Sequence, residues 1–124
     1  MKKPASSHGF KRILNASLYS YKGLVAALKT SPAFREEFIL AILLTPFAVW
    51  LPVSLQEKLW LIAAVFIVLI VELLNSAIET TVDRIGAEFH LLSGRAKDMG
   101  SAAVLLSLIF AGVVWGVVLL NYIF

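Results

Sequence analysis

Three long apolar segments follow one another in this chain of 124 residues, and they constrain its fold more than any other feature. Phe38–Leu55 lacks charged residues over 18 positions and Met99–Phe124 over 26, while Leu59–Val71 is charge-free and continues apolar to Val82 with scattered polar residues. A membrane helix needs roughly 18 or more such residues. The chain is 60% hydrophobic and 15% charged, against about 45–50% and 25% in a soluble domain. We therefore predict an all-α integral membrane protein with three transmembrane helices.

A basic amphipathic segment precedes the first apolar run. Its apolar side chains recur at helical spacing, while Lys11, Arg12 and Lys22 fall on the other side. Such a helix suits the surface of an anionic membrane, and packing against its own protein would give the same pattern. The length allows one domain, which we take as a single membrane domain over 1–124. The expected elements are a surface helix at about 8–30 and spans at about 34–52, 56–85 (with a cytoplasmic extension) and 94–122.

The distribution of basic residues predicts the orientation of the spans. The first 35 residues hold seven Lys or Arg and no acid. The turn after the first span holds only Glu57 and Lys58, whereas the turn after the second holds Arg84, Arg95 and Lys97. Because cytoplasmic loops carry the excess of Lys and Arg, we expect a multi-pass protein with a cytoplasmic N-terminus and an external C-terminus.

Acidic side chains in the middle span are the strongest indication of function. Five polar residues and a glycine share one helical face of about 100°; they are Glu72, Asn75, Ser76, Glu79, Asp83 and Gly86. Carboxylates inside a membrane are costly and usually functional, although polar groups also join helices through hydrogen bonds. A divalent cation such as Mg²⁺ would relieve their repulsion. Alternatively, one acid keeps its proton, which would suit a general base.

The cytoplasmic turn before the third span is rich in cations. We predict Ser93 as the N-cap of that span, which would place Arg95 and Lys97 near a helix N-terminus. The macrodipole disfavours cations there unless an anion binds, and ordinary anchoring of the helix explains them equally well. No Walker loop or Gly-x-Gly-x-x-Gly motif is present, so a nucleotide site would lack the usual loops. The absence of Cys excludes disulfides and thiol nucleophiles.

Two long motifs identify a family resemblance. Val71–Gly86 reads VELLNSAIETTVDRIG and Ser93–Val104 reads SGRAKDMGSAAV, and both resemble the small prokaryotic diacylglycerol kinases. The similarity extends through Gly9–Ile13, Tyr19–Leu24 and Ala33–Arg35 and so covers nearly the whole chain. The resemblance implies a homotrimer in the bacterial inner membrane, with active sites shared between subunits. It also implies transfer of the γ-phosphate of Mg·ATP to the primary hydroxyl of diacylglycerol.

The same resemblance assigns roles to individual residues. Glu72 takes the position of the catalytic base and lipid contact, with Asn75 beside it. Glu79 takes a metal position, which makes Mg²⁺ the expected cofactor, and Ser101 takes a second lipid-contacting position. The ATP-contacting positions are Arg12, Tyr19, Glu79, Glu88, His90, Lys97 and Asp98. The expected partners are diacylglycerol, ATP and membrane lipids, and no nucleic acid.

The chain departs from the family pattern at two positions. Ser31 stands where the family often has a second Glu that binds metal or ATP, and Leu91 stands where we expect an acid.

Three other functions are compatible with parts of the pattern. An undecaprenol kinase of the same family would use the same chemistry on a polyprenol. A small ion or proton transporter would need acids accessible from both faces, and in a non-catalytic scaffold the substitution Glu72→Gln would leave function unchanged.

Overall fold

A computed structural model describes residues 8–86 and 88–124 of the chain. These residues form four α-helices and no strand, so the predicted all-helical fold is confirmed for this part of the chain. The helices are α1 (Gly9–Thr30), α2 (Pro32–Trp50), α3 (Leu55–Ile85) and α4 (Leu91–Ile123). Lys2 and Lys3, which contribute to the basic N-terminal segment, lie outside the described residues.

Local side-chain chemistry ends α1 and starts α2 and α3. Ser31 lies between the first two helices in an extended conformation, and its side chain accepts a hydrogen bond from the Phe34 amide at 3.2 Å. Pro32 follows at the first helical position, where its missing N–H costs nothing. Ser54 and Glu57 form a reciprocal capping box at the start of α3. The chain therefore turns sharply at Ser31 and again at Ser54.

The predicted N-cap of the last helix is wrong. Helix α4 begins at Leu91, and its N-cap is His90, whose Nδ1 accepts a hydrogen bond from the Leu92 amide at 3.1 Å. His90 therefore supplies the capping acceptor three residues before the predicted position, and the helix starts correspondingly earlier. Lys97 consequently lies in the second turn, where the macrodipole has little effect. Its charge is therefore no argument for an anion at this helix end.

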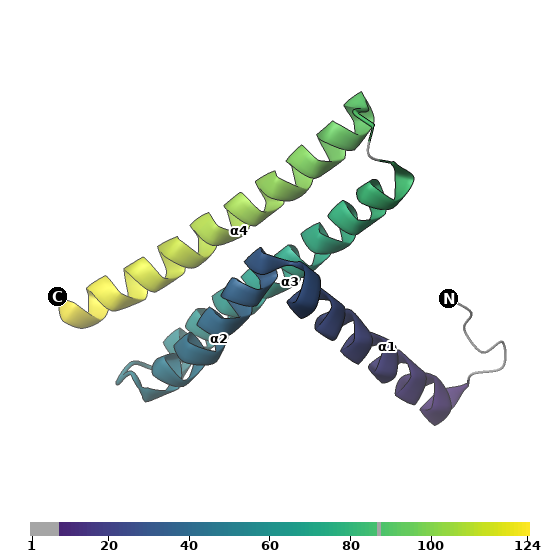
Figure 1. The fold of residues 1–124 in the computed structure, drawn as a ribbon. Coiled ribbons are helices and arrows are strands. Elements are labelled where there is room, and N and C mark those ends of the chain that lie inside the picture. The colour runs from purple at the N-terminus through teal and green to yellow at the C-terminus, as the bar shows by residue number, and fades with distance from the viewer. Residues whose placement is uncertain (1–7, 87) are drawn as a thin grey trace.

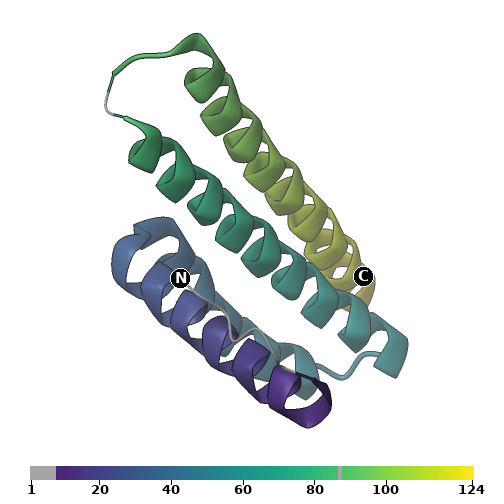
Figure 2. The same ribbon diagram turned by 90° about the vertical axis from the view of Figure 1, so that its right-hand side faces the viewer.

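Helix α3 lies between α4 and α2, and α1 runs away from this three-helix body (Figures 1 and 2). Ala27, near the C-terminal end of α1, is the buried residue of that helix. The Arg35 guanidinium donates a 3.0 Å hydrogen bond to the Leu28 carbonyl and so ties this end of α1 to α2. Most of α1 is therefore an arm that leaves the bundle at the Ser31 turn.

An apolar cluster holds the three-helix body together near the α2–α3 connection. Its buried members are Ala48, Leu51, Leu61 and Val118. Beside it, the Trp115 indole N–H donates a 3.2 Å hydrogen bond to the Leu61 carbonyl. The same ring stacks on Phe47, with 6.3 Å between the ring centroids. This packing lies at the end of α3 that is far from Asp83. The other end of the α3–α4 pair, around Asp83, carries polar side chains and a pocket.

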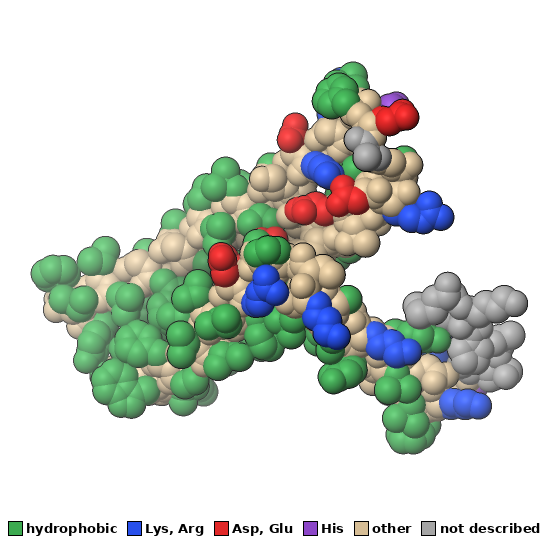
Figure 3. Space-filling model, viewed as in Figure 1, with side chains coloured by type: hydrophobic (Ala, Val, Ile, Leu, Met, Phe, Trp, Pro, Cys, Tyr) green, Lys and Arg blue, Asp and Glu red, His purple; other side chains and the backbone are tan. Residues whose placement is uncertain are grey.

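Helices α3 and α4 are long and apolar enough to cross a membrane, at 31 and 33 residues. Only 11% of the apolar 18-residue stretch of α4 is buried inside the chain, so the surface of this helix is suited to lipid or to another subunit. Hydrophobic side chains cover most of the visible face of the three-helix body, whereas Asp and Glu gather near the α3–α4 connection (Figure 3). Helix α2 carries Arg35, Glu36 and Glu37 in its first two turns.

Candidate active site

Acidic and hydroxyl side chains on one face of α3 meet the turn between α1 and α2. Glu72, Ser76, Glu79 and Asp83 follow one another at spacings of three or four residues, which places them on one side of the helix. Together with the turn they line a cavity of about 240 Å³, which we call the junction pocket. Its other lining residues are Thr30, Ser31, Pro32, Ala33 and Thr80.

The two glutamates of the junction pocket lie in different environments. Glu72 is only 4% exposed, whereas Glu79 is exposed. Seven residues of helix separate them, which corresponds to about 10 Å along the axis. The pocket therefore has a buried carboxylate at one end and an accessible carboxylate at the other. The two carboxylates can therefore contact different chemical partners, one at the buried end and one at the accessible end.

Asn75 belongs to the same polar stripe but faces α4 and does not line the junction pocket. Its side chain is 7% exposed, and its Nδ2 donates a hydrogen bond to Glu79 Oε1 at 2.9 Å. The amide also lies within interaction range of the Glu72 carboxyl. Asn75 lies between the buried and the exposed glutamate along α3, and its position one turn before Glu79 makes the bond local to that helix.

A second pocket of about 290 Å³ lies at the α3–α4 connection, and we call it the turn pocket. It brings together three predicted ATP-contacting residues, Glu88, His90 and Lys97. Lys97 Nζ forms an ion pair with Asp83 Oδ1 at 2.8 Å, and both side chains are exposed. Exposed ion pairs contribute little to stability, so Lys97 can exchange Asp83 for a phosphate at small cost. Because Asp83 lines both pockets, the two are neighbours.

Besides Asn75, four of the predicted site residues do not line either pocket. Arg12 lies in a shallow groove along α1, and Tyr19 lies two turns later on the same arm. Asp98 and Ser101 are exposed on α4. The described part of a single chain therefore brings together the residues of α3 and of the α3–α4 connection, but not those of α1.

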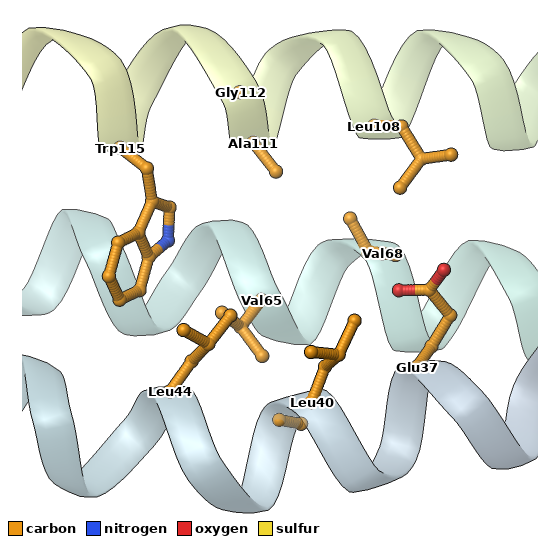
Figure 4. A pocket seen from close by; sticks show the side chains of 10 residues that line it. Glu37, Leu40, Leu44, Val65, Val68, Leu108, Ala111, Gly112 and Trp115 are labelled. Atoms are coloured by element: carbon orange, nitrogen blue, oxygen red, sulfur yellow. The ribbon is translucent and has the colours of Figure 1, made fainter.

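The sequence reasoning missed Glu37. This residue is the one charged member of an apolar pocket of about 340 Å³ between α2, α3 and α4. Figure 4 shows its carboxylate reaching from α2 toward α3, above Leu40 and near Val68. Its charge lies close enough to Glu72 for the two carboxylates to repel each other. The sequence holds only a weak signal, since Glu37 is the acid directly before the charge-free run Phe38–Leu55.

The junction pocket suits a hard divalent cation that is shared with a ligand. Its polar side chains offer only oxygen donors, which are the ligands that Mg²⁺ prefers. Among the described residues, no three His, Cys, Asp or Glu side chains are grouped closely enough to hold a metal by themselves. Mg²⁺ commonly uses one or two carboxylates and completes its shell with water and phosphate oxygens. The residues present therefore fit Mg²⁺ bound together with a phosphate group.

Comparison with known proteins shows one consistent likeness. The family model for prokaryotic diacylglycerol kinase matches residues 18–119. The diacylglycerol kinase of Escherichia coli (strain K12) is 52% identical over 114 residues, covering 92% of this chain and 93% of that protein. The Pseudomonas aeruginosa diacylglycerol kinase is 51% identical over 113 residues, covering 91% and 92%. The Helicobacter pylori (strain J99) diacylglycerol kinase is 42% identical over 123 residues, covering 99% and 96%.

Proposed function

The chain belongs to the prokaryotic diacylglycerol kinase family, and from this premise we propose that it transfers the γ-phosphate of ATP to the primary hydroxyl of diacylglycerol, giving phosphatidic acid. One observation of the structure supports the proposal above all others. A buried carboxylate, Glu72, lies at the inner end of a pocket whose open end carries Glu79. A lipid hydroxyl and a water-soluble phosphate can therefore meet along one face of α3.

Glu72 is the general base in this proposal. Its carboxylate accepts the proton of the lipid hydroxyl as the new bond forms between that oxygen and the γ-phosphorus. The bond between the γ-phosphorus and the β–γ bridging oxygen breaks at the same time, and ADP leaves with the electron pair. Phosphoryl transfer depends mainly on positioning and charge neutralisation, which Lys97 and Arg12 would assist.

Glu79 and Asn75 hold the phosphate end of the site. We assign Glu79 as the protein ligand of Mg²⁺, and phosphate oxygens would complete the coordination shell. The bound ion would neutralise charge on the β- and γ-phosphates. Asn75 orients the Glu79 carboxylate through the 2.9 Å hydrogen bond. The turn pocket next to Asp83 would then receive the remainder of the nucleotide, near Glu88, His90 and Lys97. Asp98, exposed beside Lys97 on α4, is the further residue that we assign to the nucleotide.

The apolar pocket is suited to the lipid side of the reaction. It lies between the helices at the level of Glu37, whose carboxylate is close to Glu72. An acyl chain that enters this pocket would bring its glycerol group to the inner end of the junction pocket. Glu37 would then contact the polar group of the lipid, and Ser101 is the second residue that we assign to the lipid.

We further propose that α2 is the third membrane span and that the protein is an inner-membrane homotrimer with shared sites. Phe38–Leu55 supplies the apolar length of this span, partly beyond the end of α2. The N-terminus would be cytoplasmic and the C-terminus external. Arg12 and Tyr19 lie on an arm that leaves the body of their own chain, which is compatible with their reaching a site on a neighbouring subunit.

A mixed-micelle assay with Mg²⁺ and labelled ATP tests the function. Diacylglycerol and undecaprenol are offered in parallel, with Glu72→Gln as the inactive variant. Glu36→Gln is the matched control, because Glu36 is exposed on α2 and lines neither the apolar nor the junction pocket. We expect label in phosphatidic acid with the wild type and the control, and its loss with Glu72→Gln by at least about 100-fold. Preference for undecaprenol would contradict the assignment of diacylglycerol as the substrate. An active Glu72→Gln variant would contradict the assignment of Glu72 as the general base.

A further inference from the structure

Gly100 on α4 packs directly against the side chain of Asn75. A Cβ atom added at Gly100 would overlap Asn75 Oδ1 and would lie 3.3 Å from Asn75 Cγ. The other glycines of α4 are different: Gly94, Gly112 and Gly116 have nothing within 4 Å of such an atom. Glycine is unfavourable inside a helix, so a glycine with a tight contact indicates a need for space at that position. The group that occupies this space is the Asn75 amide.

The contact leaves the Asn75 amide little choice of orientation. Its Oδ1 is buried and accepts no hydrogen bond within the described chain, while its Nδ2 donates to Glu79. The oxygen and the nitrogen belong to one planar group, so a displacement of Oδ1 also moves Nδ2. A side chain at position 100 would therefore disturb the bond to Glu79 without touching Glu79 itself.

We propose that Gly100 is a positioning residue for phosphoryl transfer: the missing side chain lets the Asn75 amide lie between α3 and α4 in the orientation that donates to Glu79. The inference rests on the proposed roles of Glu72 and Glu79. It gives α4 a role in orienting Asn75, in addition to the roles proposed above for Lys97, Asp98 and Ser101. The competing explanation is that Gly100 serves only the close packing of α3 and α4.

A double-mutant cycle separates the two explanations. Gly100→Ala, Asn75→Ala and the double variant are compared with the wild type in the mixed-micelle assay. The measured quantities are kcat, KM for Mg·ATP, the thermal midpoint and equilibrium binding of a non-hydrolysable ATP analogue with Mg²⁺. Gly116→Ala is the matched control, since it adds the same methyl group to α4 in open space.

If Gly100 acts through Asn75, Gly100→Ala lowers kcat at least about tenfold in the wild-type protein. In the Asn75→Ala background, the same substitution lowers kcat by less than about twofold. The thermal midpoint and analogue binding follow the same pattern, with the double variant resembling Asn75→Ala. Equal losses from Gly100→Ala in both backgrounds would overturn the inference, because the effect of the methyl group would then not pass through the amide.

Loss of folding in Gly100→Ala would still leave a decisive comparison. A folded double variant whose kcat and KM for Mg·ATP equal those of Asn75→Ala would support the inference, and an unfolded double variant would overturn it. Failure of the proposed function is separately visible in other variants. If Glu72→Gln and Glu79→Gln keep wild-type turnover, the site assignment fails whatever the cycle gives. If both are impaired and the cycle is additive, only the role of Gly100 fails.

Discussion

Ser76 donates its side-chain hydroxyl to Ser31, with 3.0 Å between the two oxygens, and this bond joins the middle of α3 to the N-cap of α2. Both residues line the junction pocket beside Glu72 and Glu79. Ser31 therefore has two structural hydrogen bonds, one from Ser76 and one from the Phe34 amide. It also occupies the position at which the family resemblance leads us to expect a Glu.

Ser31→Glu should lower the concentration of Mg²⁺ that the enzyme requires. The longer side chain adds a carboxylate to the junction pocket, so we expect half-maximal activity at a lower Mg²⁺ concentration. Ser31→Gln is the matched control, because it has the same size without the charge and should leave the Mg²⁺ dependence unchanged. Both variants lose the N-cap hydroxyl, which lowers the free energy of unfolding by about 1 kcal/mol. An identical Mg²⁺ dependence in the two variants would exclude a metal at this turn.

Glu79→Gln should weaken the binding of Mg·ATP as well as turnover. The amide is neutral and binds Mg²⁺ poorly, so KM for Mg·ATP rises, whereas Glu72→Gln lowers kcat with little change in that KM. Steady-state kinetics with ATP and Mg²⁺ varied separately distinguish the two variants. The assignment of roles is reversed if Glu72→Gln shows the larger change in KM for Mg·ATP.

Glu37→Gln should affect the lipid and not the nucleotide. Its carboxylate lies in the apolar pocket near Glu72, so we expect a higher KM for diacylglycerol and an unchanged KM for Mg·ATP. The neighbouring Glu36→Gln is the control and should leave both KM values as in the wild type. A change confined to KM for Mg·ATP would show that this pocket does not receive the lipid.

Mixing of two inactive variants tests whether subunits share a site. Arg12→Ala and Glu72→Gln remove residues that lie far apart in one chain, on the arm and in the body. Mixed oligomers should regain activity, because some sites then combine an intact Arg12 with an intact Glu72. The readout is turnover against the mixing ratio, which should pass through a maximum. A mixture that never exceeds the sum of its components would place both residues in the site of one chain.

Periodicity within a helix was sufficient to predict which acids share a face, since Glu72, Glu79 and Asp83 do line one pocket. The start of α4 was mispredicted because His90 and Ser93 are both able to cap a helix, and only the geometry of the turn decides between them. Glu37 and Gly100 had no signal of comparable strength. Their importance depends on how α2 and α4 are aligned along α3, and the spacing of residues within one helix carries no information on that alignment.

The buried position of Glu72 also determines which concentration governs the reaction. Withdrawal of a lipid from the bilayer would expose its acyl chains to water at about 0.8 kcal/mol per methylene group. As the proposed base, Glu72 lies below the accessible end of its pocket, so the hydroxyl would be reached inside the membrane and the acceptor would be spared this transfer. Encounters between enzyme and acceptor then occur in two dimensions. The rate therefore follows the mole fraction of diacylglycerol in the surrounding lipid and not its amount per volume of solution.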